Sequence, residues 1–210
     1  MEIKRNPIEE KSMKIIDELV GFPEINIEEK EIRSRLVHTS GDPSLYWELI
    51  ISKGAVDAGI YALENKNNIV TDVRMVEAGI RKKWLKNSGN NIFCAIDLPE
   101  VAEEAKRKDK TRSATAIEIL KDKINDSIVL IGNAPTALIE LLDLVKKDEI
   151  KPALIIGIPV GFVDAASSKE KLSRQKKIPF ITLPGTRGGS SIASAILNAL
   201  INIYKIRKGI

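Results

Sequence analysis

Two short apolar runs, at residues 128–131 and 153–158, stand out in the hydrophobic pattern of this chain. Each is rich in Ile and Leu and lies beside Gly or Pro, which is typical of buried strands. Between them, Leu and Val recur at helical spacing over residues 134–147. A strand, a helix and a second strand in this order predict a right-handed parallel crossover. Ligands of parallel sheets bind beyond the carboxyl ends of the strands, so residues 132–135 and 159–162 are the first candidates for a site.

Three further apolar runs, at residues 69–73, 92–96 and 180–183, bring the predicted strands to five. Helical periodicity fills most of the remaining chain, at residues 7–20, 27–39, 44–53, 55–66, 75–85, 99–108, 113–123 and 192–204. The pattern predicts an α/β fold, with a doubly wound five-stranded parallel sheet and an extra N-terminal helical region of four helices. We interpret residues 1–210 as one domain, with a helical part at 1–66 and an α/β part at 67–210.

The single histidine, His38, lies in the last turn of the predicted helix at residues 27–39. Arg35 is three residues earlier and can share its face. Histidine is the residue type whose unperturbed pKa, about 6.5, is nearest to neutrality, so His38 is a candidate proton donor, and a surface or capping role is the alternative. Ser12 and Arg112 are weaker candidates, because a serine inside a helix usually bonds the preceding turn and a loop arginine is usually solvated.

A glycine-rich segment, residues 185–191, precedes the last predicted helix. Its backbone amides and the helix N-terminus favour an oxyanion such as a carboxylate. The segment has neither a Walker sequence nor a dinucleotide fingerprint, which disfavours a nucleotide site. A hydrolase using Ser190 or Ser191 is a further alternative, but the chain has no second histidine and no nucleophile-elbow pattern.

Composition narrows the choice of ligand. The net charge is only +4 and aromatic residues are 4% of the chain, which disfavours nucleic acid and suits an acidic small molecule.

The chain has one cysteine, Cys94, which can form no intramolecular disulfide and favours a cytoplasmic location. One histidine and one cysteine also disfavour a zinc site. No apolar run is long enough to span a bilayer, and the first residues lack the apolar core of a signal peptide.

Several longer motifs occur together, in a fixed order along the chain. They are Arg35-Leu36-Val37-His38, Asp72-Val73-Arg74-Met75-Val76, Thr111-Arg112-Ser113, residues 133–138 (NAPTAL), residues 157–163 (GIPVGFV) and Gly188-Gly189-Ser190. In this combination the chain resembles the precorrin-8X methylmutases, also called cobalt-precorrin-8 methylmutases, of corrin biosynthesis. Thr186 departs from the pattern, since a basic residue is often found there.

The resemblance implies an isomerase that moves a methyl group between adjacent ring carbons, from C11 to C12, of precorrin-8X or cobalt-precorrin-8. The product would be hydrogenobyrinate or cobyrinate. His38 would donate a proton to a ring nitrogen, and Ser12, Arg35 and Arg112 would contact the tetrapyrrole substrate. The family also implies a flavodoxin-like sheet, a homodimer, and no cofactor or protein-bound metal. A non-catalytic corrinoid carrier with the same pocket is the alternative.

Overall fold

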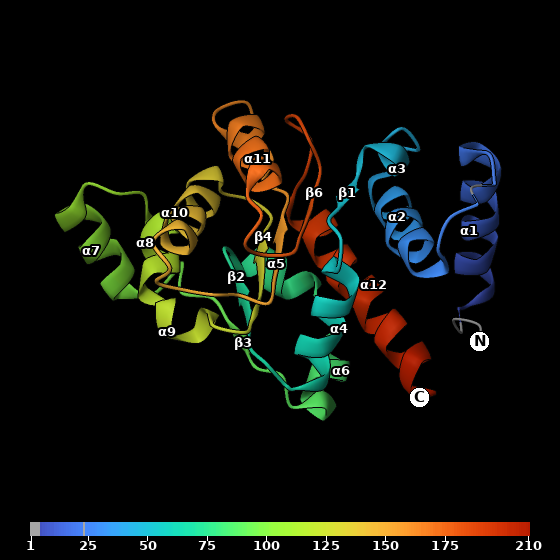
Figure 1. Cartoon of the computed structure of the whole chain (residues 1–210), viewed down its shortest axis with the longest axis horizontal. Helices are drawn as coiled ribbons and strands as arrows, with labels where there is room; N and C mark the ends of the chain where they lie inside the picture. Colours follow the sequence, from blue (N-terminus) through green and yellow to red (C-terminus); the bar gives the residue numbers. More distant parts are fainter. Residues whose placement is uncertain (1–4, 23) are drawn as a thin grey trace.

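The computed structural model describes residues 5–22 and 24–210. The first four residues, part of the N-terminal segment considered above for a signal peptide, lie outside this range. Within it, helices cover both faces of a central sheet, and a further group of helices extends from one side (Figure 1). In the described part of the chain, no helix combines the length and apolar composition needed to cross a bilayer.

The sheet has six strands in the order β1-β6-β5-β4-β2-β3. Strands β2 to β6 run parallel, and the predicted parallel pairing of β4 with β5 is confirmed, with Ile128 opposite Leu154. The short edge strand β1 runs antiparallel to β6. The bounds are β1 (Ile50–Ile51), β2 (Ile69–Thr71), β3 (Ile92–Phe93), β4 (Ile128–Ile131), β5 (Leu154–Gly157) and β6 (Phe180–Thr182).

The predicted count of five strands is wrong, because β1 lies where we expected a helix at residues 44–53. That helix is only α3 (Leu45–Glu48), and the chain then becomes extended and pairs with β6. The hydroxyl of Ser52 accepts a hydrogen bond from the Phe180 amide, and the Ser52 amide donates to the Phe180 carbonyl. A strand of two residues is too short to show the alternation of apolar and polar residues that predicts a strand. Strand β1 is therefore recognised only from its contacts with β6.

Two other predicted helices are interrupted. Residues 75–85 form α5 (Arg74–Gly79) and α6 (Lys82–Ser88), with an extended residue, Ile80, between them. Residues 113–123 form α8 (Arg112–Ile119) and α9 (Lys121–Ile124). Arg112 is therefore the first residue of a helix rather than part of the preceding loop.

Each strand contributes to two cores, because successive side chains point to opposite faces of a sheet. Ile128 and Leu130 of β4 belong to one buried cluster, and Val129 and Ile131 to the other. The second cluster is covered by helices that include α7 (Pro99–Lys108), α8, α9, α10 (Pro135–Lys146) and α11 (Ala165–Arg174). The first is covered by α5, α6, α4 (Ala55–Glu64) and α12 (Ser190–Lys208).

The N-terminal helices form a further layer beyond α12. Helix α2 (Ile27–Ser40) packs on α12, and α1 (Pro7–Val20) packs on α2 (Figure 1). Helix α12 therefore has the sheet on one side and α2 on the other, which explains why twelve of its residues are buried. Asn6 caps α1 by accepting from the Glu9 amide, and Gly21 ends it in the left-handed conformation.

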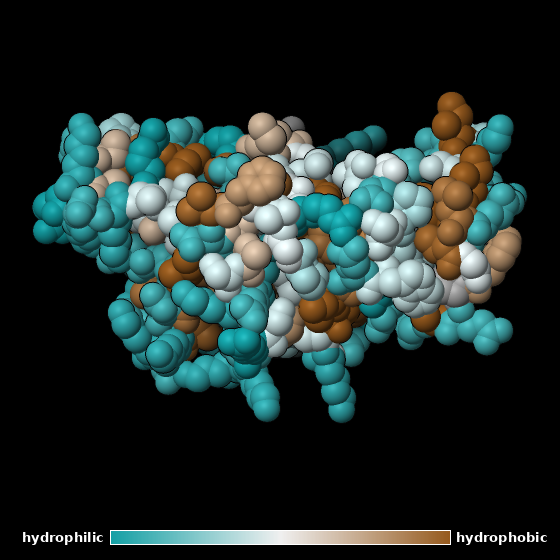
Figure 2. Space-filling view, turned by 90° about the horizontal axis from the view of Figure 1, so that it is seen from above, coloured by the Kyte–Doolittle hydropathy of each residue, from teal (hydrophilic) through white to brown (hydrophobic). Residues whose placement is uncertain are grey.

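Helix α1 also exposes an apolar stripe. Ile8, Ile15 and Leu19 are 83%, 45% and 62% exposed and are spaced by seven and four residues, so they share one face. Phe22, just beyond the helix, is also exposed. Figure 2 shows apolar side chains gathered at the end of the molecule where α1 lies. A soluble monomer rarely leaves such a stripe uncovered.

Candidate functional site

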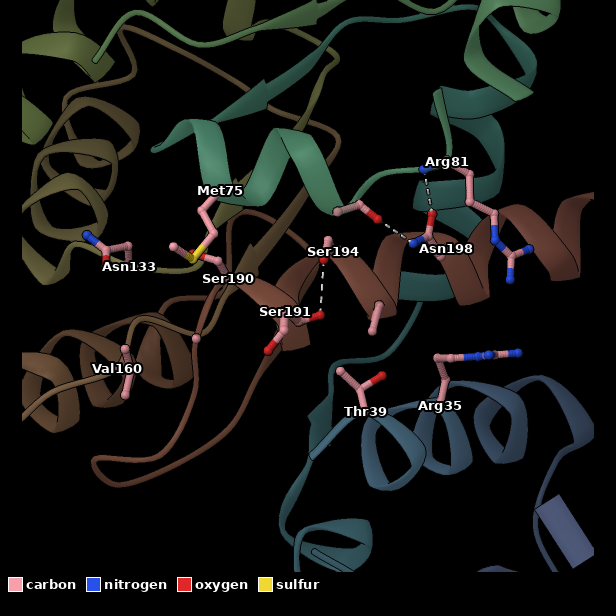
Figure 3. A pocket seen from close by; sticks show the side chains of 13 residues that line it. Arg35, Thr39, Met75, Arg81, Asn133, Val160, Ser190, Ser191, Ser194 and Asn198 are labelled. Atoms are coloured by element: carbon pink, nitrogen blue, oxygen red, sulfur yellow. Dashed lines mark hydrogen bonds between the residues drawn. The ribbon is translucent and has the colours of Figure 1, made fainter. Parts of the chain in front are cut away.

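A cavity of about 620 Å³ opens where the carboxyl edge of the sheet meets α12 and α2. Its position agrees with the prediction for a parallel sheet. Residues from five segments of the chain line it (Figure 3): Asn133, Val160 and Gly189 from the loops after β4, β5 and β6; Ser190, Ser191, Ser194, Ala195 and Asn198 from α12, which continues directly from Gly189; Met75, Gly79 and Arg81 from α5 and the segment after it; and Arg35 and Thr39 from α2.

A buried carboxylate fixes the loop that carries Asn133. Asp72, at the end of β2, accepts hydrogen bonds from the amides of Gly132, Asn133 and Ala134 at 3.1, 2.8 and 2.9 Å. Burial raises the pKa of the Asp72 carboxyl, and these amide hydrogen bonds oppose that increase. Asp72 does not line the cavity, so its role is to position the loop.

The glycine-rich segment packs directly against the loop after β5. A Cβ atom on Gly188 would lie 2.4 Å from the Ile158 carbonyl oxygen, so only glycine permits this approach. The Gly189 amide donates to the same oxygen at 3.0 Å. From α11, the buried Lys169 donates to the Arg187 carbonyl at 2.6 Å. These contacts set where α12 begins, and its first residues, Ser190 and Ser191, line the cavity.

One end of the cavity is cationic. Arg35, buried on α2, forms ion pairs with Glu9 of α1 and Glu31 of its own helix. Glu31 is itself buried, and it also contacts Arg5 and accepts from the Asn202 amide at 2.8 Å. Burial raises the pKa of Glu9, but the hydrogen bond and charge of Arg35 outweigh it, so the net change is a decrease. We call Arg5, Glu9, Glu31, Arg35 and Arg81 the charged cluster.

The other end of the cavity is apolar. Met75 and Val160 line it, and both are exposed. In Figure 3, Met75, Val160 and Asn133 lie on one side of the α12 N-terminus, and Arg35 and Arg81 lie on the other. The cavity therefore offers an apolar surface, a helix N-terminus and guanidinium groups in succession. This arrangement suits a ligand with a large apolar body and carboxylates at its edge.

The structure brings two of the predicted site residues into contact. The Ser12 hydroxyl and His38 Nδ1 are 2.8 Å apart, although the residues lie on different helices, α1 and α2. His38 is exposed and is not among the lining residues, whereas its neighbour Thr39 and Arg35 are. Ser12, for which a bond to the preceding turn was the alternative, is thus a partner of the histidine. If the hydroxyl donates to Nδ1, the proton of the neutral ring is on Nε2.

Arg112 is separate from this group. It donates to the Ile96 carbonyl at 2.6 Å, near the end of β3, and it does not line the cavity. Within the described residues, no cluster of His, Cys, Asp or Glu side chains is arranged to hold a metal ion.

The sequence analysis missed Arg81, Asn198 and Met75 as lining residues. Arg81 begins a basic run, Arg81-Lys82-Lys83, which by itself indicates only a solvated surface. Asn198 and Asn202 gave a usable signal, because they are four residues apart in the mainly apolar middle of their helix. Such a pair predicts that one helix face meets polar groups rather than the core.

Comparisons with known proteins agree with the motifs. A model of the precorrin-8X methylmutase family matches residues 7–203. The chain is 40% identical to the cobalt-precorrin-8 methylmutase of Methanocaldococcus jannaschii, covering 99% of this chain and 92% of the relative. It is 39% identical to the precorrin-8X methylmutase of Pseudomonas aeruginosa, covering 87% and 86%. The crystal structure of a precorrin-8X methylmutase from Thermus thermophilus matches with a TM-score of 0.87 and 33% identity, covering 95% and 96%.

Proposed function

This chain belongs to the precorrin-8X methylmutase family, an isomerase family of cobalamin biosynthesis, and we propose that its methyl shift takes place between the cavity and the Ser12–His38 pair. The enzyme is an intramolecular methyltransferase. Its substrate is a tetrapyrrole, a broad and largely apolar ring with carboxylates on its side chains. The apolar end of the cavity accommodates the ring, and the α12 N-terminus and the guanidinium groups receive carboxylates.

His38 acts as the proton donor to a ring nitrogen during the methyl shift. The observation that carries this proposal is the 2.8 Å contact between Ser12 Oγ and His38 Nδ1. It fixes the orientation of the imidazole and leaves Nε2 as the nitrogen that can donate to a ligand. No other histidine occurs in the chain. A positioned general acid contributes about 10²–10⁴-fold to a rate, and correct positioning of the substrate adds to it.

Arg35 and Arg112 remain predicted substrate contacts. The ion pairs of Arg35 with Glu9 and Glu31 support a bracing role for it as well, since they join α1 to α2 beside the cavity. Arg112 lies at the carboxyl edge of β3, so its contact would need a ligand that extends beyond the cavity or a second subunit.

We propose a homodimer in which the exposed stripe of α1 is covered by a second copy of the chain. Ser12 is on the same helix, four residues from Ile8, so the Ser12–His38 pair borders this stripe. A partner seated there would complete the wall of the site next to the histidine. The proposal therefore links assembly to catalysis.

Several finer assignments stay predictions. The five parallel strands follow the order 2-1-3-4-5 when numbered along the chain, which supports the flavodoxin-like assignment. Residues 1–66 and 67–210 form one functional unit in this proposal, since both parts line the cavity. A cytoplasmic location and the absence of nucleic-acid binding are predictions from composition.

The test is turnover of the purified protein with the substrate, with and without cobalt in the ring, followed by the product's absorption spectrum. We expect conversion by the wild type and a decrease in kcat of about 10²–10⁴-fold for His38→Ala, with product affinity retained. Ser40→Ala, an exposed change at the end of the same helix, is the control and should leave kcat unchanged. Near-normal turnover by His38→Ala would refute the role of His38. Product binding without any conversion by the wild type would favour the corrinoid carrier.

A further inference from the structure

Among the residues that the structure describes, one positive charge in the charged cluster has no carboxylate partner. Arg5 contacts Glu31, and Arg35 contacts both Glu9 and Glu31. Arg81 makes one side-chain hydrogen bond, to the Asn202 amide oxygen at 2.6 Å, and no described carboxylate forms an ion pair with it. Three guanidinium groups therefore face two carboxylates. The excess charge is located on Arg81, which lines the cavity together with Arg35.

Arg81 is nevertheless held in place. Its backbone amide donates to the Asn198 side-chain oxygen at 3.1 Å, and the Asn198 amide group donates to the Gly79 carbonyl at 2.9 Å. The side chain of Asn202 has a defined orientation, because its amide nitrogen donates to Glu31 and a carboxylate only accepts. The amide oxygen of Asn202 must then face Arg81. This series of hydrogen bonds, from the buried Glu31 through Asn202, holds the Arg81 guanidinium in place without neutralising its charge.

The Arg81 residue is exposed, but part of its surroundings disfavours the positive charge. Burial lowers the pKa of the Arg81 guanidinium and the positive charge of Arg35 lowers it further, whereas the charges of Glu9 and Glu31 oppose this decrease. In Figure 3, the guanidinium groups of Arg81 and Arg35 project toward the same end of the cavity from opposite sides. A carboxylate entering this end would offset both effects, and it would find a guanidinium with free N–H groups in a fixed orientation.

We infer that Arg81 binds a carboxylate of the ligand and that Asn202, oriented by Glu31, is its positioning residue. The identity of the ligand as a corrinoid rests on the proposed function, whereas the site itself rests on the charge and geometry of the cluster. Arg81 is thus the arginine of the charged cluster that no described carboxylate pairs with, whereas the ion pairs of Arg35 also brace α1 against α2. Charged hydrogen bonds of this kind correspond to about 10- to 100-fold in affinity.

The experiment compares Arg81→Gln, Arg81→Lys and Lys82→Gln. Lys82 is the matched control, because it carries the same charge one residue away, pairs with Glu77 at 3.7 Å and does not line the cavity. Binding of the corrin product is measured by spectroscopic titration, once with free carboxylates and once with the carboxylates converted to neutral amides. We expect Arg81→Gln to weaken binding of the carboxylate form about 10- to 100-fold, relative to Lys82→Gln, with little effect on the amide form. Arg81→Lys should restore part of the loss, and KM should change more than kcat.

Product binding is measured separately from turnover. A failure of the proposed function can therefore be distinguished from a failure of the inference about Arg81. If the wild type binds product but converts no substrate, the proposed function is wrong, and the titrations still test Arg81. If Arg81→Gln matches Lys82→Gln for the carboxylate form, the inference is wrong. It is also wrong if Arg81→Gln shifts the protein from dimer to monomer with unchanged affinity per site, since Arg81 would then serve a partner subunit.

Discussion

Lys169 provides a quantitative test of how the cavity is supported. Its side chain is 1% exposed, and its ammonium group donates to the Arg187 carbonyl, two residues before Gly189. Burial lowers the pKa of Lys169 from 10.5 to about 8. The perturbation is Lys169→Met, which keeps the length of the side chain and removes the charge and the hydrogen bond.

The sign of the pH dependence follows from proton binding. Below pH 8 the lysine is protonated in both states, so the folded protein bears the full penalty of the buried charge. Between pH 8 and 10.5 the unfolded state binds more protons, and the free energy of unfolding therefore rises with pH. The difference between the two pKa values corresponds to about 3 kcal/mol, of which about 2–3 kcal/mol is recovered between pH 7 and 10.

The assay is urea unfolding, followed by circular dichroism, for the wild type and Lys169→Met from pH 7 to 10. Other lysines and tyrosines titrate in this range, so the informative quantity is the difference in free energy of unfolding between the two proteins. We expect wild type minus variant to rise by about 2–3 kcal/mol with pH. Lys171→Met, an exposed change on the same helix, should give a flat difference. Parallel curves for wild type and Lys169→Met would show that Lys169 is not a desolvated cation.

Two further predictions concern the walls of the site. Gly79→Ala should destabilise the protein by about 1–3 kcal/mol in urea unfolding and raise KM, because the new Cβ would lie 2.8 Å from Ser194 Cβ and force α5 away from α12. Unchanged stability would contradict this close packing. If the proposed homodimer forms, Leu19→Glu should convert it to a monomer in analytical ultracentrifugation and decrease turnover with it, because a charge would replace the 62% exposed leucine in the α1 stripe. A monomeric wild type would rule out the dimer.

The sequence predicted the parts of the fold that depend on local pattern. Helix α1 has the expected bounds, because Pro7 lies in its first turn and Gly21 supplies the left-handed residue at its end. The five parallel strands were visible as apolar runs between Gly, Pro and polar residues. Strand β1 was not, because its two residues pair with β6 across about 130 positions of the sequence. The break after Gly79 was also hidden, since the backbone there bonds to the distant Asn198 side chain of α12, through the Gly79 carbonyl and the Arg81 amide.

For the candidate site, the resemblance to the family supplied His38, Ser12 and Arg35, and the comparisons confirm that family. The contact between Ser12 and His38 joins two helices, and residue spacing within one helix carries no information about it. Arg81 was missed for a similar reason. Its significance depends on which arginines are already paired with carboxylates, and pairing is a property of the folded charged cluster.

The packing of α2 on α12 is what relates His38 to the cavity. Ile32 and Leu36 of α2 are fully buried in the same cluster as Leu197 and Ile201 of α12, so this contact is apolar and rigid. The ion pairs around it, such as Arg187 with Asp42, are partly exposed and contribute little to stability. Their effect is to orient two segments relative to each other, because Arg187 joins the glycine-rich segment to the loop after α2. The apolar contact therefore sets the distance between His38 and the cavity. Under the inference for Arg81, the charged cluster would favour a ligand with a carboxylate that reaches the guanidinium with which no described carboxylate pairs.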